Sequence, residues 1–139
     1  MKVAVIYAST TGNTEAMANA INEQVKANGG QTVFGTADSA DAQEVLSCDV
    51  LLLGSPAMGD EVLEDSVEEF FGQIEGSLSG KKVALFGSYD WGDGQWLRDW
   101  EDRVKSCGAT ITAESLKVHL TPDDSGIAEC KAWASKAAA

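Results

Sequence analysis

Short apolar runs rich in β-branched residues recur along the chain, and segments with helical periodicity separate them. The clearest runs are Val3 to Tyr7, Val50 to Leu53, Val83 to Phe86 and the less regular Thr110 to Val118. A weaker run, Gln31 to Thr36, follows the helix-stop and turn sequence Asn28-Gly29-Gly30. Runs of this length and composition predict β-strands.

Apolar residues three or four positions apart mark amphipathic helices between these strands. They form the groups Met17, Ile21 and Val25; Val67, Phe70, Phe71 and Ile74; Trp96, Trp100 and Val104; and Ile127, Cys130 and Ala134. Apolar strands that alternate with helices indicate a parallel sheet covered on both faces, which is a doubly wound α/β fold. Ligands bind beyond the carboxyl ends of such strands, so we expect function in the loops after strands one, three and four.

Length and composition indicate the class of protein. The chain has 139 residues, 44% hydrophobic and 23% charged, which is typical of one soluble domain covering residues 1–139. No apolar run approaches the length that crosses a bilayer. The first strand begins without the apolar stretch and cleavage site of a signal peptide, so we expect a cytoplasmic protein.

Charge and cysteine content argue against several functions. Twenty-two acidic and ten basic residues give a formal charge of −12, which repels nucleic acid and anionic membranes and attracts partners with basic patches. The cysteines Cys48, Cys107 and Cys130 are far apart and include no C-x-x-C pair. We therefore expect no disulfide framework, no zinc site and no catalytic cysteine.

The loop after the first strand, Ser9-Thr10-Thr11-Gly12-Asn13-Thr14, is rich in hydroxyl groups and opens a helix. Free backbone N–H groups and the positive end of the dipole favour an anion at a helix N-terminus, so this loop is a candidate phosphate site. It contains no Lys or Arg, unlike the loop of a nucleotide triphosphatase. Taken alone, it also fits an ordinary Ser/Thr-rich turn with a capping residue.

Other motifs found on this fold fail on inspection. The segment Gly92 to Leu97 begins like a dinucleotide fingerprint but has Leu97 in place of the third glycine. The segment Gly76 to Lys81 is one residue short of the Walker A spacing and precedes a strand, whereas that motif follows one. Gly54 and Ser55 stand where a receiver domain needs an aspartate.

Each of the other two loops carries one large apolar side chain among glycines and acids. Met58 lies in the loop from Gly54 to Glu61, and Trp91 lies in the loop from Gly87 to Gly94. Two such side chains on neighbouring loops can sandwich a flat aromatic ring. The alternatives are that Met58 fills a gap in the packing and that Trp91 anchors its own loop.

At these three loops the sequence resembles the short-chain flavodoxins of anaerobic bacteria, over essentially the whole chain. The segments that carry the resemblance are Ser9 to Thr14, Ala57-Met58-Gly59-Asp60-Glu61-Val62-Leu63-Glu64, and Lys81-Lys82-Val83-Ala84-Leu85-Phe86-Gly87-Ser88-Tyr89 followed by Trp91-Gly92. The resemblance implies a flavodoxin-like doubly wound sheet of five parallel strands in the order 2-1-3-4-5, with helices on both faces.

The same resemblance implies the function. The protein would bind flavin mononucleotide (FMN) non-covalently and shuttle single electrons at low potential between redox partner proteins, substituting for a ferredoxin. The expected partners are oxidoreductases with basic docking surfaces, including those that also use ferredoxin. The protein would act as a monomer and would have no catalytic residue, metal site or substrate of its own.

The resemblance also assigns roles within the loops. The first loop would hold the FMN phosphate, Met58 and Trp91 would pack on the two faces of the isoalloxazine ring, and Glu61 would accept a hydrogen bond from N3–H. The expected cofactor-binding residues are Ser9, Thr10, Thr11, Gly12, Asn13, Thr14, Ser55, Pro56, Ala57, Met58, Gly59, Asp60, Glu61, Ser88, Tyr89, Asp90, Trp91 and Gly92.

Some positions depart from the family pattern. Ala8 stands where close relatives usually carry Trp, and Thr10 and Asp90 stand where they carry Gly. Pro56 occupies a position at which some members offer a phosphate-binding hydroxyl, and Pro has no N–H to donate. These departures concern the phosphate contacts and the backbone at Asp90, and they leave the expectation of FMN unchanged.

Gly59 and the acidic residues determine the expected redox behaviour. Because Gly59 lacks a Cβ, the Gly59–Asp60 peptide can turn its carbonyl toward the flavin N5 proton gained with the first electron. The three loops contain several acids and no basic residue. At about 10 Å and a dielectric of about 40, each acid opposes the second electron by roughly 0.8 kcal/mol, so we expect a low second potential.

Two other functions fit the same fold. An FMN-dependent NAD(P)H:quinone or flavin reductase needs a substrate pocket over the flavin, but Trp91 is expected to cover that face and the acidic rim disfavours NADPH. A redox-inert binding module would have lost the cofactor, yet all three loops retain suitable residues. We therefore expect an electron carrier.

Overall fold

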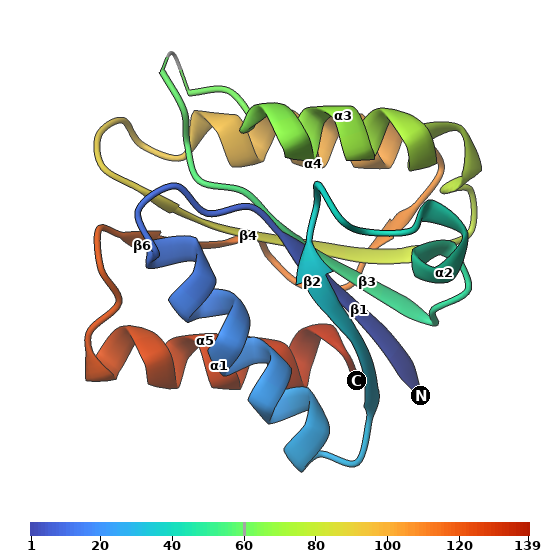
Figure 1. Ribbon diagram of the computed structural model, residues 1–139, viewed down its shortest axis with the longest axis horizontal. Coiled ribbons are helices and arrows are strands. Elements are labelled where there is room, and N and C mark those ends of the chain that lie inside the picture. Colours follow the sequence, from blue (N-terminus) through green and yellow to red (C-terminus); the bar gives the residue numbers. More distant parts are fainter. Residues whose placement is uncertain (60) are drawn as a thin grey trace.

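The computed structural model describes residues 1–59 and 61–139, and strands and helices alternate along it (Figure 1). The elements are β1 (Lys2–Tyr7), α1 (Asn13–Ala27), β2 (Gln31–Thr36), α2 (Ala42–Leu46), β3 (Val50–Gly54), α3 (Asp65–Ile74), the 3-10 turn η1 (Glu75–Ser77), β4 (Lys82–Tyr89), α4 (Gln95–Ser106), β5 (Thr110–Ile111), β6 (Leu116–His119) and α5 (Asp124–Ala137). The four helices expected from periodicity are confirmed as α1, α3, α4 and α5.

The strands pair in parallel in the order β2-β1-β3-β4-β5, and β6 also pairs with β4. The expected doubly wound sheet and its strand order are confirmed. One detail differs, because the run from Thr110 to Val118 forms two short strands. Ile111 of β5 pairs with Val83 of β4, and Leu116 of β6 pairs with Phe86 of β4. Five positions therefore separate the paired residues on the β5–β6 side, but only three separate them on β4. The two extra residues interrupt the ladder in the manner of a β-bulge.

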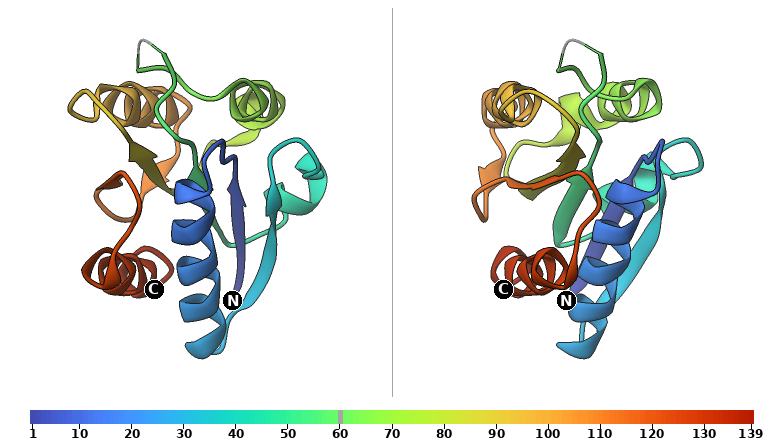
Figure 2. Two further views of the ribbon diagram at one scale, coloured as in Figure 1. Left: turned by 60° about the vertical axis from the view of Figure 1, so that its left-hand side comes forward. Right: turned by 90° about the vertical axis from the view of Figure 1, so that its left-hand side faces the viewer.

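Helices cover both faces of the sheet. Figures 1 and 2 show α1 and α5 on one face and α3 and α4 on the other. Successive residues of β1 alternate between these layers: Val3 and Val5 belong to the core under α1 and α5, and Ala4 and Ile6 to the core under α3 and α4. Because helices cover both faces of the sheet, β3 is buried at all five of its positions.

This arrangement brings the carboxyl ends of β1, β3, β4 and β6 to the same edge of the sheet, together with the N-terminus of α1. The loops that the sequence singled out follow these ends, and Figure 1 shows them on the left of the view. Among the described residues, no helix combines the length and the apolar character needed to cross a membrane.

Candidate functional site

A cavity of about 290 Å³ opens at the carboxyl edge of the sheet. It is lined by Thr10, Thr11, Asn13, Pro56, Ala57, Ser88, Tyr89, Asp90, Trp91 and Leu120. The structure thus brings residues of all three expected loops around one space, and it adds Leu120 from the segment that follows β6.

Backbone N–H groups converge where the first loop meets α1. The hydroxyl of Ser9 accepts from the N–H of Gly12 at 3.1 Å and from that of Glu15 at 3.2 Å. The N–H groups of Asn13 and Thr14 donate to no residue that the structure describes. These two free donors lie at the positive end of the helix dipole beside exposed threonine hydroxyls, which fits a phosphate held by neutral groups.

Three hydroxyl side chains of the expected set are buried at the site. The Thr14 and Ser88 hydroxyl oxygens lie 2.6 Å apart in a hydrogen bond that joins the start of α1 to β4. Ser55 is completely buried, and its hydroxyl donates to the Pro56 carbonyl and accepts from the Glu64 N–H. Of these, only Ser88 lines the cavity, so Thr14 and Ser55 support its wall from beneath.

The third loop presents an aromatic surface. Trp91 is 58% exposed, so it does not anchor its loop by burial. Beside it, the Tyr89 ring centroid lies 5.7 Å from that of Trp96 and 5.0 Å from that of His119. An exposed indole over a cavity fixed by packed aromatics fits the stacking of a flat ring.

Two residues of the second loop and its continuation, Met58 and Val62, pair with each other. Met58 and Val62 exchange two backbone hydrogen bonds, each of 3.0 Å. Gly59 between them has a φ of +40°, and a Cβ built there would meet no atom of the described residues within 4 Å, its chain neighbours left aside. Met58 is half-buried and lies outside the cavity lining, and the expected site residue Asp60 lies outside the described residues.

Glu61 joins the second loop to the third. Its Oε1 atom accepts from the N–H of Gly94 at 3.1 Å and of Gln95 at 2.9 Å, at the start of α4. Its other carboxylate oxygen makes no hydrogen bond to a described residue. A Cβ at Gly92 would lie 2.5 Å from the Glu61 carboxyl carbon, so glycine there makes room for the carboxylate. This capping contact was not predicted from the sequence.

Basic residues from outside the loops reach the third loop. Arg98 of α4 donates to the Asp93 carboxylate at 2.8 Å, and this hydrogen bond holds the pKa of Asp93 below its ordinary value. Lys117 of β6 donates to the Asp93 carbonyl at 2.8 Å. The loops themselves contain no basic residue, as noted from the sequence, but the fold supplies two cations beside Asp93 and partly offsets that charge.

The segment 119–121, which consists of His119, Leu120 and Thr121, was not expected at the site. Leu120 N–H donates to the Tyr89 carbonyl at 2.8 Å, and the Thr121 hydroxyl donates to the Asn13 side-chain oxygen at 2.9 Å. No motif marks this segment in the sequence. The available signal was topological, because it follows a strand that ends at the same sheet edge.

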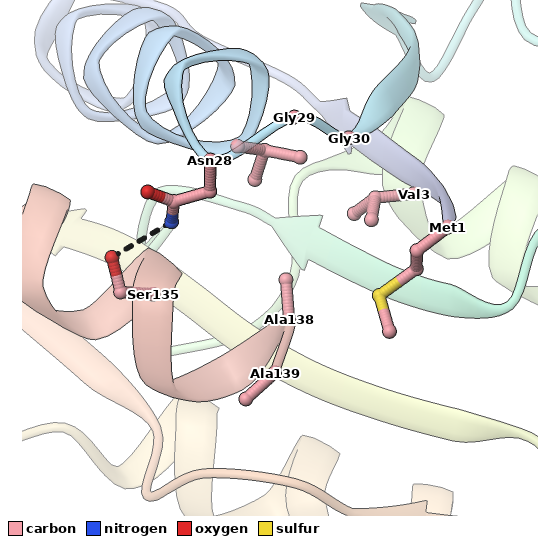
Figure 3. A pocket seen from close by; sticks show the side chains of 9 residues that line it. Met1, Val3, Asn28, Gly29, Gly30, Ser135, Ala138 and Ala139 are labelled. Carbon is pink, nitrogen blue, oxygen red and sulfur yellow. Dashed lines mark hydrogen bonds between the residues drawn. The ribbon is translucent and has the colours of Figure 1, made fainter.

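A second cavity of about 260 Å³ lies at the opposite end of α1 (Figure 3). Asn28 and Ser135, the polar side chains among its lining residues, are hydrogen-bonded to each other at 3.0 Å. The remaining lining residues are apolar: Met1, Val3, Val25, two glycines and two alanines. This cavity therefore offers no free polar side chain to a ligand.

Comparison with known proteins identifies the family to which this chain is similar. The family model described as Flavodoxin matches residues 5–133. Over 137 residues the chain is 47% identical to a flavodoxin of Megasphaera elsdenii, covering 98% of each chain. A flavodoxin of Clostridium beijerinckii is 45% identical over 121 residues, which are 86% of this chain and 88% of that one. The solution structure of two-electron reduced Megasphaera elsdenii flavodoxin superposes with a TM-score of 0.88 at 46% identity, covering 99% of this chain and 98% of that one.

Proposed function

The chain belongs to the flavodoxin family, and from this membership we propose that its three loops hold FMN and tune it as a low-potential carrier of single electrons. The protein is an FMN-binding electron carrier and has no substrate conversion of its own. When bound, FMN supplies the redox chemistry, and the protein supplies binding, orientation and electrostatics.

One observation supports this placement of FMN most strongly. Residues from the loops after β1, β3 and β4 surround a single cavity beside the free N–H groups that open α1. The cavity therefore combines an anion site at one helix N-terminus with an exposed indole, Trp91, on the neighbouring loop. A phosphate joined to a flat aromatic ring has both of the chemical parts that this arrangement can bind.

Different residues would contact different parts of FMN. The N–H groups of Asn13 and Thr14 and the hydroxyls of the first loop would bind the phosphate. Trp91 would cover one face of the ring and exclude water from it, and Met58 would approach the other face. The uncapped oxygen of Glu61 would accept from the ring N3–H while its partner oxygen continues to cap α4.

Gly59 would hold the proton at the ring N5 by offering its carbonyl. Apart from its chain neighbours, no atom in the described part of the chain lies within 4 Å of a Cβ built at Gly59, and glycine itself permits the change of backbone angles. The acids of the second and third loops would oppose added negative charge and lower the second potential. Asp93 would contribute less than the others because Arg98 binds its carboxylate.

The alternative of an FMN-dependent reductase is not favoured, because the relatives at 47% and 45% identity are flavodoxins. Electron carriage implies redox partner proteins. We infer that these partners present basic docking surfaces, since this chain carries a charge of −12, and that they include oxidoreductases that also use ferredoxin. We infer further that the chain works as a monomeric single domain in the cytoplasm.

A ligand titration tests the proposed site. FMN and riboflavin share the ring and differ in the phosphate, so their affinities, followed by flavin fluorescence, separate the two parts of the cavity. We expect FMN to bind with quenched fluorescence, and riboflavin to bind more weakly by the loss of the phosphate contacts. Equal affinities, or no binding of either, would contradict the proposed placement.

A further inference from the structure

The segment 119–121 connects two of the proposed FMN-binding loops although it belongs to neither. One contact reaches Asn13 at the start of α1, and the others reach Tyr89 and Asp90 in the third loop. This segment continues from β6, whose residues Leu116 to His119 are fixed against Phe86 to Tyr89 of β4. The end of a paired strand therefore connects the first loop with the third.

Among the contacts of this segment, that of His119 is made to Asp90, the residue before Trp91. The His119 Nε2 atom lies 2.9 Å from the carbonyl oxygen of Asp90. A carbonyl oxygen can only accept, so Nε2 carries the proton and donates. The His119 ring also lies beside the Tyr89 ring, with centroids 5.0 Å apart, which fixes the direction of the donor.

The backbone next to His119 indicates that this contact is maintained by the surrounding structure. Leu120 has a φ of +60°, a backbone conformation that residues other than glycine rarely adopt. Its N–H donates to the Tyr89 carbonyl at 2.8 Å, and its side chain lines the cavity while remaining 44% exposed. Strained residues of this kind persist where neighbouring contacts determine them, and they cluster at ligand sites.

We propose that His119 is a positioning residue of the flavin site, whose Nε2–H fixes the Asp90 carbonyl and thereby holds Trp91 beside the cavity. The proposal rests on the proposed function, since it assumes that the third loop contacts the flavin ring. Thr121 has a separate effect, because it orients the Asn13 amide on the phosphate side.

Two substitutions isolate the donor. His119→Phe keeps an aromatic ring beside Tyr89 but removes the N–H, and His119→Gln restores a side-chain N–H. We expect His119→Phe to weaken both FMN and riboflavin by about two- to tenfold, the usual effect of one hydrogen bond, and His119→Gln to recover most of that loss. Both dissociation constants come from flavin fluorescence titrations.

A second measurement needs no flavin. Trp91 is 58% exposed, whereas Trp96 and Trp100 are 1% and Trp133 is 8% exposed, so acrylamide quenching of the protein reports on Trp91. His119→Phe should change this quenching and His119→Gln should restore it. Thr121→Val serves as the matched control on the same segment, and it should weaken FMN while leaving riboflavin binding and Trp91 quenching unchanged.

The outcomes separate the possibilities. If wild-type protein fails to bind FMN, the proposed function itself is wrong. If wild-type protein binds FMN but His119→Phe matches it in affinity and in quenching, His119 does not position the loop. The inference also fails if His119→Gln is as weak as His119→Phe, or if Thr121→Val lowers riboflavin affinity as much as His119→Phe does.

Discussion

The Glu61 carboxylate caps helix α4 by accepting a hydrogen bond from the Gln95 N–H at 2.9 Å. The same oxygen accepts from Gly94 at 3.1 Å, so one side chain of the second loop satisfies two free donors at the end of the third. A negative group is also favoured there by the helix dipole. Glu61 therefore ties together the two loops proposed to enclose the flavin ring.

This contact predicts a stability effect that is independent of the cofactor. Glu61→Ala should lower the free energy of unfolding of the FMN-free protein by about 1 kcal/mol, the usual effect of losing a cap, because two N–H groups lose their acceptor. Glu61→Gln should lose less, since its amide oxygen still accepts. Urea denaturation measures both. Asp102→Ala, at an exposed position of the same helix, is the control and should be close to neutral; a similar loss there would show that the cap is not the cause.

Trp91→Ala should weaken FMN binding and increase the fluorescence of bound flavin. Stacking on an aromatic ring contributes about 0.5 to 1.5 kcal/mol beyond area burial, which corresponds to a two- to tenfold change in the dissociation constant. Trp91→Phe keeps a stacking surface and should retain most of the affinity. Fluorescence titration measures both quantities. Wild-type quenching and affinity in Trp91→Ala would show that the indole does not contact the ring.

If the first loop binds the phosphate, substitutions in it should affect the affinity for FMN more than the affinity for riboflavin. Thr11→Val should weaken FMN by about 1 to 3 kcal/mol and affect riboflavin much less, because a phosphate oxygen loses its partner. Ser9→Ala and Thr14→Val should also weaken FMN more than riboflavin, because these two side chains hold the backbone whose N–H groups would bind the phosphate. Ser9 acts partly through its bonds to the Gly12 and Glu15 N–H groups, and Thr14 partly through Ser88. Equal losses for both flavins would show that this loop is not the phosphate site.

Much of the fold followed from periodicity because buried strands and amphipathic helices leave strong signals. The exceptions are short or local. Helix α2 has five residues with one buried, Val45, so it shows no helical period. The division of the last strand into β5 and β6 depends on a register against β4 that the sequence alone does not reveal.

At the site, glycines, hydroxyls and aromatics made the three loops recognisable, whereas contacts that depend on tertiary structure were invisible. Glu61 was expected only as a ligand acceptor, but in the structure it also caps α4. Arg98 and Lys117 reach Asp93 from elements outside the loops. The positive φ of Leu120 accompanies its backbone hydrogen bond to the Tyr89 carbonyl, and leucine itself carries no preference for that conformation.

Substitution of Gly59 should change the first midpoint potential of the bound flavin. Among the described residues outside its chain neighbours, none has an atom within 4 Å of a Cβ built at Gly59, so we expect Gly59→Ala to act through the backbone angles and to penalise a turned peptide by about 1 kcal/mol. The first midpoint potential should fall by tens of millivolts, since about 59 mV corresponds to 1.4 kcal/mol for one electron. Gly59→Thr should lower it further because β-branching narrows the allowed angles. Unchanged potentials in both variants would rule out the peptide turn as the source of stabilisation.

An anaerobic potentiometric titration of the FMN-bound protein, followed by visible absorption, shows whether this chain tunes FMN as a low-potential carrier of single electrons. Binding that favours single-electron transfer must separate the two reduction steps, and acids near the ring must push the second step to low potential. The predicted result is two resolved one-electron steps, the second well below that of free FMN. A single two-electron step at the potential of free FMN would contradict the account.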